Sequence, residues 1–270
     1  MLKNLFFCSF LAIATFSCKK DETVLPEPTK AQPQKFTIDS VKISDSMTVA
    51  DSLTLVYNNK LLYFPTLKNE TLLDSIYFLY PQLTDFSKVG LQNFLNTKKD
   101  QFFSQFNNEK KSWVESVSFK QTWYDKNEMK IISNTNDYMH IQYAGSSFMG
   151  GAHNNYYFSE RVFDLKNNKR TVLTDITTMP DEKLSEILFK NLNKMPTGAN
   201  SGTEEVKNSD MLLVDKIPVT DNFYFDEKNL YFHYSPYEIA AFAAGDITIP
   251  IPWTDLAGTL NEEFKSRNGL

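Results

Sequence analysis

Three histidines are the side chains in this sequence best suited to bind a metal or to move protons near neutral pH. His140, His153 and His233 lie in separate segments, and their spacing matches no standard set of zinc ligands. The sequence contains no His-Glu-x-x-His helix, Gly-x-Ser-x-Gly elbow, P-loop or dinucleotide fingerprint. We therefore predict no metal and no other cofactor, and we interpret His140 and His233 as strand residues that face neighbouring side chains or solvent.

The segment from Met149 to His153 is distinctive because two adjacent glycines precede a small residue and a histidine. Glycine adopts backbone conformations that other residues avoid, and it allows another chain to approach closely. Such a turn can present a histidine and several backbone amides to a ligand. Gly150, Gly151, Ala152 and His153 are therefore candidate ligand-binding residues. The alternative is a purely structural bulge that lets a strand cross over tightly.

Tyr237 and Glu238 lie in a second distinctive segment, directly after Pro236, and we add both to the candidate ligand-binding residues. Glu238 is the carboxylate that we single out for acid–base chemistry. Its alternative role is to cap a short helix, since the exposed amides at a helix N-terminus stabilise an acidic side chain. We predict no catalytic residue, and we keep as an alternative an enzyme that uses Glu238 and His153 on a polysaccharide.

The N-terminus is typical of an exported protein. Lys3 precedes an apolar run, Leu5 to Phe16, that is too short to span a bilayer as a stable helix. Ser17 and Cys18 follow, and charged residues begin directly after them. We predict a lipoprotein signal peptide over residues 1–17 and acylation of Cys18, for example with palmitate, so that lipid anchors the mature chain in a membrane.

This predicted signal departs from the usual bacterial pattern, which has Leu three residues and Ala or Ser two residues before the cysteine. Thr15 and Phe16 occupy those positions, so the alternative is an ordinary secretory signal with an incidental cysteine. Cys8 lies inside the apolar run, so cleavage before Cys18 leaves no thiol that could form a disulfide. Residues 19–22 resemble the charged tract of Bacteroidetes lipoproteins. We predict location in the cell envelope, at the periplasmic or surface face of the outer membrane.

The composition indicates a globular protein, with 41% hydrophobic and 23% charged residues. About 250 residues follow the predicted leader, enough for one large domain or two small ones. The 22 phenylalanines and 13 tyrosines suit a half-buried sheet or an aromatic recognition surface. A net charge of −5, without a basic stripe, argues against nucleic acid as a partner and is compatible with a cationic one.

Hydrophobic spacing predicts the elements of the fold. Residues 18–35 contain three prolines and are typical of a flexible tether. We assign residues 36–110 to an N-terminal α+β subdomain and residues 111–270 to a C-terminal domain. Asn58-Asn59 and Asp125–Glu128 are interpreted as turns. The predicted strands cover residues 36–43, 53–57, 61–64, 113–124, 129–133, 137–144, 153–165, 170–173, 223–225, 230–234 and 247–249. The predicted helices cover residues 67–80, 85–106, 181–194 and 236–245. We expect an α+β fold in which an antiparallel meander sheet packs with several helices.

Two stretches of the sequence resemble a known family of extracytoplasmic domains. They are residues 143–153 with residues 163–176, and residues 223–225 with residues 231–252. The motifs Gly-Gly-Ala-His153 and Pro-Tyr-Glu-Ile-Ala240 carry the resemblance, which covers residues 110–258. The family is that of RsiV-type anti-sigma factors, whose domain also accompanies some peptidoglycan deacetylases and is otherwise mostly of unknown function.

The resemblance implies an α+β fold and a binding role, because in the anti-sigma factors this domain is a receptor for host lysozyme. Ala241-Phe242 replaces the Pro-Tyr step of the family. We recognise no sigma-binding segment and no deacetylase domain, so signalling through a sigma factor is not expected. We expect a lipid-anchored envelope protein that binds a lysozyme-like muramidase or a cell-wall glycan. A polysaccharide-acting enzyme and a structural envelope lipoprotein are the alternatives.

Overall fold

The computed structural model describes residues 37–107, 119–195 and 207–270. All of them belong to one unit, Pro33–Leu270. The predicted signal peptide, Cys18, the predicted tether and residues 113–118 of one predicted strand lie outside the described residues. Within the described ranges, no helix has the length and apolar character needed to cross a membrane.

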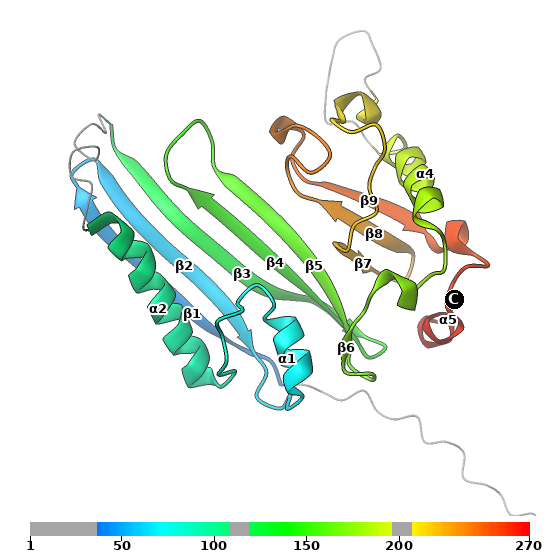
Figure 1. Ribbon diagram of the computed structural model, residues 1–270, viewed down its shortest axis with the longest axis horizontal. Helices are drawn as coiled ribbons and strands as arrows, with labels where there is room; N and C mark the ends of the chain where they lie inside the picture. The colour runs from blue at the N-terminus through cyan, green and yellow to red at the C-terminus, as the bar shows by residue number, and fades with distance from the viewer. Residues whose placement is uncertain (1–36, 108–118, 196–206) are drawn as a thin grey trace, which may run out of the picture. The chain divides into compact units, whose positions relative to one another are not determined.

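A six-stranded sheet forms the larger layer of the fold (Figure 1), in the order β1-β2-β3-β4-β5-β6. Its strands are β1 (Asp39–Ala50), β2 (Leu53–Tyr63), β3 (Gln121–Thr135), β4 (Tyr138–Phe148), β5 (Asn155–Asp164) and β6 (Lys169–Arg170). Every neighbouring pair is antiparallel except β2 and β3, which run parallel. The predicted meander is therefore only partly correct. Parallel strands need a crossover connection, and the helices between β2 and β3 supply it.

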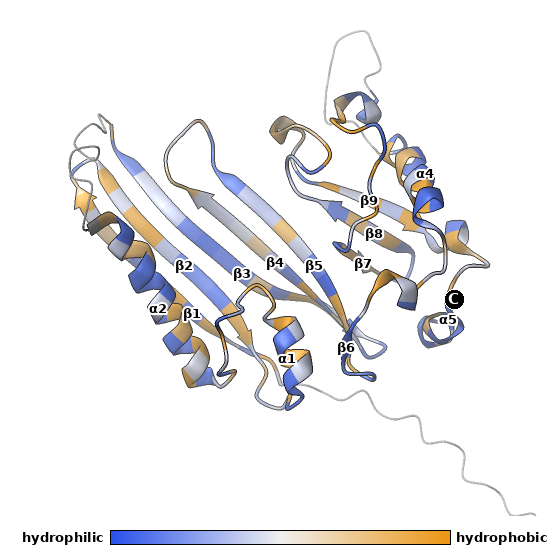
Figure 2. Cartoon of the chain, viewed as in Figure 1, coloured by the Kyte–Doolittle hydropathy of each residue, from blue (hydrophilic) through white to orange (hydrophobic). Residues whose placement is uncertain are grey.

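Two predicted turns are wrong, because both lie inside continuous strands. Asn58 and Asn59 are in the middle of β2, and residues 125–128 are in the middle of β3. Figure 2 shows the hydrophilic colour across the middle of these two strands. The side-chain amides of Asn59 and Asn127 both donate hydrogen bonds to the carboxylate of Asp125. Residues that favour turns are tolerated here because they satisfy one another across the parallel pair.

The helices α1 (Glu70–Ile76) and α2 (Lys88–Asn107) pack on one face of this sheet. Both overlap the predicted helical segments, and the side chain of Asn69 caps α1 by accepting from the backbone N–H of Leu72 at 2.9 Å. The alternate residues of the strands that face the helices form the first core. Its largest fully buried members include Tyr77, Tyr143, Phe163, Leu61, Leu72 and Ile76.

A three-stranded antiparallel sheet forms the second core. Its strands are β7 (Phe223–Phe225), β8 (Asn229–Tyr234) and β9 (Ile247–Pro252), in that order, and it packs with α4 (Asp181–Leu192) and α5 (Glu262–Asn268). Short 3-10 turns complete this part: η1 (Leu173–Asp175), η2 (Asn208–Met211), η3 (Phe242–Ala244) and η4 (Trp253–Leu256). The predicted hairpin of β7 and β8 and the predicted helix at residues 181–194 are confirmed.

The predicted helix at residues 236–245 is wrong in its extent. The chain first makes a turn, in which the N–H of Tyr237 donates to the carbonyl of Ala240 at 3.1 Å. Only the single turn η3 follows, and Gly245 ends it with a φ of 73°. Pro236 can begin a helix, but four alanines over residues 240–244 carry too little apolar surface to hold a longer helix against the core.

Candidate functional site

The loop before β5 and the turn after β8 bring two of the predicted ligand-binding residues together. The Nε2 atom of His153 lies 3.3 Å from the hydroxyl of Tyr237. The two residues are 84 positions apart in the sequence, so only the fold joins them. Both are exposed. This pairing is the part of the predicted site that the structure assembles.

Two further aromatic side chains complete this group. The imidazole of His153 stacks on the ring of Phe242, with centroids 3.9 Å apart and an angle of 18° between the planes. Tyr156 meets Phe242 edge to face at 5.6 Å, and Tyr237 lies 5.7 Å from Phe242. We name His153, Tyr156, Tyr237 and Phe242 the aromatic cluster. No sequence signal indicated Tyr156 or Phe242 as site residues, although Phe242 is aromatic at the position where the RsiV-type domains that the sequence resembles have tyrosine.

Tyr237 has an unusual backbone conformation, with a φ of 71°, and 58% of the residue is exposed. A bulky residue in the left-handed region is strained, by about 1–3 kcal/mol, and such strain gathers at binding and active sites. The N–H of Tyr237 donates to the carbonyl of Ala240 within the turn, and its ring contacts His153 and Phe242. The cluster therefore presents an aromatic ring to solvent.

The two glycines of the predicted site have separate roles. Gly150 has a φ of 89°, and a Cβ added there would lie 2.9 Å from Cζ2 of Trp123. Gly151 has a φ of 108° and faces open space. Both positions require glycine for their backbone conformation, and Gly150 also allows the loop to approach Trp123. Ala152 is exposed in the same loop.

Glu238 is hydrogen-bonded through its carboxylate within its own turn and does not extend into the aromatic cluster. Its carboxylate accepts a hydrogen bond of 2.9 Å from the backbone N–H of Ser235, and its own N–H donates to the carbonyl of Ser235 at 3.1 Å. The hydroxyl of Ser235 in turn accepts from the backbone N–H of Phe158 on β5 at 2.9 Å. Glu238 therefore closes the turn that carries Tyr237. Its carboxylate accepts from a backbone amide, as in the predicted capping role, but the element is a turn and not a helix.

A buried carboxylate connects the two sheets. Glu160 on β5 is 1% exposed, and its two oxygens lie 2.6 Å from Nε2 of His140 and 2.9 Å from Nδ1 of His233. Gln142 also donates to Glu160, at 2.8 Å. The other ring nitrogen of His233, Nε2, lies 3.2 Å from the partly exposed carboxylate of Asp246. The prediction that His140 and His233 are strand residues facing neighbouring side chains is confirmed.

Hydrogen bonds keep the carboxyl group of Glu160 ionised. Burial alone would raise the pKa of Glu160, but the hydrogen bonds from His140, His233 and Gln142 outweigh burial and lower the pKa to about 2. Glu160 is therefore ionised at every physiological pH. No sequence signal pointed to Glu160, because a glutamate in a strand ordinarily faces solvent and the histidines that surround it come from other strands.

Charged residues line a groove beside the aromatic cluster. The groove has a volume of about 410 Å³ and lies on the face of the large sheet opposite α1 and α2. Lys42, Lys60 and Lys126 line it from β1, β2 and β3, and Tyr156 belongs both to its wall and to the aromatic cluster. We name this hollow the basic groove. Its size is in the range of small-ligand sites.

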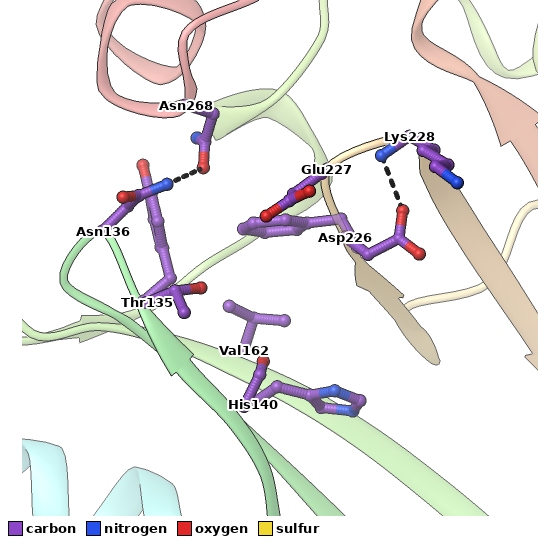
Figure 3. A pocket seen from close by; sticks show the side chains of 11 residues that line it. Thr135, Asn136, His140, Val162, Asp226, Glu227, Lys228 and Asn268 are labelled. Carbon is purple, nitrogen blue, oxygen red and sulfur yellow. Dashed lines mark hydrogen bonds between the residues drawn. The ribbon is translucent and has the colours of Figure 1, made fainter.

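A second cleft, of about 320 Å³, lies where the β3–β4 turn, the β7–β8 turn and the end of α5 meet (Figure 3). Val162 and His140 form part of its lining, and Asn136 bonds to Asn268 across it at 3.2 Å. The stick view shows the carboxylate of Asp226 turned toward the backbone of Lys228. Among the described residues, no three His, Cys, Asp or Glu side chains are grouped so that they could hold a metal ion.

Part of the chain matches a known family model. Residues 174–254 match the DUF3298 family model, described as a protein of unknown function. This range contains Tyr237 and Phe242 of the aromatic cluster, whereas His153 and Tyr156 precede it. No curated protein sequence matches the chain.

Two solved structures of DUF3298 family proteins share the fold. One, from Bacteroides fragilis, is 20% identical with a TM-score of 0.65, over 84% of this chain and 94% of that chain. The other, from Pseudomonas aeruginosa, is 14% identical with a TM-score of 0.52, over 84% of this chain and 96% of that one. The mixed α+β architecture is therefore established. At these identities the likeness concerns the fold alone.

Proposed function

We propose that this chain is a lipid-anchored protein of the cell envelope that binds a lysozyme-like muramidase through the aromatic cluster. The observation that carries the proposal is the exposed ring of Tyr237, which has a left-handed backbone conformation and contacts His153 and Phe242. An exposed tyrosine with few remaining conformations is typical of the residues that dominate protein interfaces. We expect binding to lose little conformational entropy, because the contacts with His153 and Phe242 already restrict the ring.

Charge and the sequence resemblance both support this partner. The chain has a net charge of −5, which attracts a cationic protein and speeds its encounter more than it strengthens the final complex. The resemblance to RsiV-type domains suggests a lysozyme-like ligand by analogy. The hydrogen bonds of Glu238 within its own turn favour a binding role for this site over an acid–base role.

The interface prediction is tested by replacing Tyr237 with alanine. We expect the dissociation constant for lysozyme to rise roughly thirtyfold, which corresponds to about 2 kcal/mol, because this aromatic residue of the cluster is 58% exposed and available to a partner. The measurement is titration calorimetry with the full chain in detergent micelles. Phe189→Ala is the matched control, because Phe189 is 40% exposed on α4 and lies outside the cluster. If wild type gives no heat with lysozyme at millimolar concentration, the proposed partner is wrong.

The anchor is tested separately from the partner. Replacing Cys18 by alanine is expected to abolish incorporation of labelled palmitate and to release the protein from the membrane fraction, because the acyl chains supply the membrane affinity. Metabolic labelling followed by fractionation of the cells measures both effects. A variant that carries as much label as wild type would show that acylation at Cys18 does not occur.

A further inference from the structure

We propose that the basic groove is a binding site for a carboxylate-bearing oligosaccharide. The groove adjoins the proposed muramidase interface and shares Tyr156 with it, but the proposal does not depend on that interface. Its charge comes from three lysines on one face of adjacent strands, Lys42 on β1, Lys60 on β2 and Lys126 on β3. Lys42 and Lys60 are direct partners in the antiparallel register. Like charges placed directly opposite each other destabilise a sheet, so an anion in the groove relieves a repulsion.

The acidic residues around the groove leave most of this positive charge uncompensated. Glu128 lines the groove and bonds to Lys60 at 2.9 Å. Among the described residues, no carboxylate pairs with Lys42 or Lys126. The ammonium of Lys126 instead lies 4.7 Å from the ring centroid of Tyr124. The groove therefore carries net positive charge on a chain whose net charge is −5, and this complementarity favours an anionic occupant.

The remaining lining indicates a sugar as the carrier of that negative charge. The aromatic residues Tyr156 and Phe158 form one side of the groove, and apolar ring surfaces of this kind pack well against the C–H faces of pyranose rings. Ser146 and Asn154 place a hydroxyl and an amide beside them, and Asn58 places a further amide on the other side of the groove, on β2. Such groups can donate to or accept from sugar hydroxyls. A bare inorganic anion would use the lysines and leave the aromatic and amide side of the groove without a function.

The test is calorimetry of the full chain in detergent micelles with two matched probes. The first is tetragalacturonate, which carries a carboxylate on each ring, and the second is its methyl ester, in which the same sugar is neutral. We expect the acid to bind at least tenfold more tightly than the ester and to lose affinity as ionic strength rises, because partly exposed charges are screened by salt. Equal affinity for acid and ester would overturn the proposal, as would absence of binding at millimolar concentration.

Two double variants locate the site. Lys42→Gln with Lys126→Gln is expected to weaken tetragalacturonate binding on the order of tenfold, since each lysine that contacts a carboxylate contributes a charged hydrogen bond. Lys68→Gln with Lys190→Gln removes the same charge from exposed positions outside the groove and is expected to leave affinity unchanged. Thermal melts verify that both variants fold. If the two variants lose affinity equally, the effect is one of net charge only and the groove is not the site.

Competition experiments distinguish a sugar site from a general anion site and from the muramidase interface. Inorganic phosphate at equal ionic strength is expected to compete weakly, and full competition would reduce the groove to a general anion site and overturn the sugar assignment. Lysozyme binding is expected to survive the Lys42/Lys126 change, and tetragalacturonate binding is expected to survive Tyr237→Ala, because Tyr237 does not line the groove. Failure of either proposal is thereby distinguishable from failure of the other.

Discussion

Replacing Glu160 by glutamine is expected to lower the free energy of unfolding at pH 7 by about 2–4 kcal/mol. The carboxylate is 1% exposed and lies between two buried histidines. Glutamine has nearly the same shape, but its amide offers a single acceptor oxygen to groups that now share two. At least one of the contacts with His140, His233 or Gln142 is therefore lost in a site that water cannot reach.

The same substitution is expected to change how stability depends on pH. The pKa of Glu160 is about 2 in the folded protein, below its ordinary value of 4.5. A carboxyl group whose pKa is lowered by folding stabilises the fold above its ordinary pKa and loses that contribution as pH falls toward the folded value. The contribution of this group, about 3 kcal/mol, is therefore complete above about pH 5 and disappears toward pH 2.

Urea unfolding at a series of pH values measures both effects. Wild type is expected to lose stability steeply between pH 5 and pH 2, and Glu160→Gln is expected to show a shallower acid limb. Glu186→Gln is the control, because the Glu186 side chain is 60% exposed in a pair with Lys183 and such pairs contribute less than about 1 kcal/mol. Parallel acid limbs for wild type and Glu160→Gln would show that this carboxylate does not govern acid stability.

Replacing Tyr143 by alanine is expected to destabilise the protein by about 3–5 kcal/mol, the usual range for removing a large aromatic side chain from a core. Tyr143 is 1% exposed and meets Phe78 edge to face at 5.3 Å. Its hydroxyl donates a hydrogen bond of 2.6 Å to the carbonyl of Ile76, at the end of α1. Tyr143 therefore joins β4 to the helix that covers the sheet.

Tyr143→Phe separates packing from hydrogen bonding. The ring remains, but the carbonyl of Ile76 loses its partner inside the core, so we expect a loss of about 1–2 kcal/mol. Denaturant unfolding of both variants measures the difference, with Phe189→Ala as an exposed control that should change stability by less than about 1 kcal/mol. Equal losses for Tyr143→Phe and Tyr143→Ala would mean that the hydroxyl, and not the ring, provides the stabilisation.

The helices and most strands could be predicted from sequence, because the spacing of apolar residues follows burial on one face. The side chains of Leu91, Leu95, Phe102 and Phe103 on α2 are buried as their spacing predicts. The same reasoning failed at Asn58-Asn59 and at residues 125–128. Turn preference is a local property, whereas the hydrogen bonds that keep these residues in strands join β2 to β3 across the sheet.

The candidate site, too, could be predicted only where local sequence determines the structure. The Gly150-Gly151 step could be recognised because glycine has a conformational signature of its own, and the structure gives both residues a positive φ. The partner of His153 could not be derived, since Tyr237 is brought to it by packing between the two sheets. Glu160 was missed for a related reason. A single strand offers no sign that two histidines from other strands will surround one of its carboxylates.

The parallel contact between β2 and β3 also has a consequence for how the chain assembles. The hairpin of β1 and β2 and the hairpins of β3, β4 and β5 each join strands that are close in sequence, whereas β2 and β3 meet only after the intervening helices have closed a long loop. We therefore expect this junction to form late and each of the two strands to expose an unpaired edge to other copies until then. Asp125 acts against wrong pairing. Out of register or beside a foreign strand, its carboxylate would keep the amide of Asn127 on its own strand but lose that of Asn59 on β2, so the polar middle of the sheet favours the native alignment.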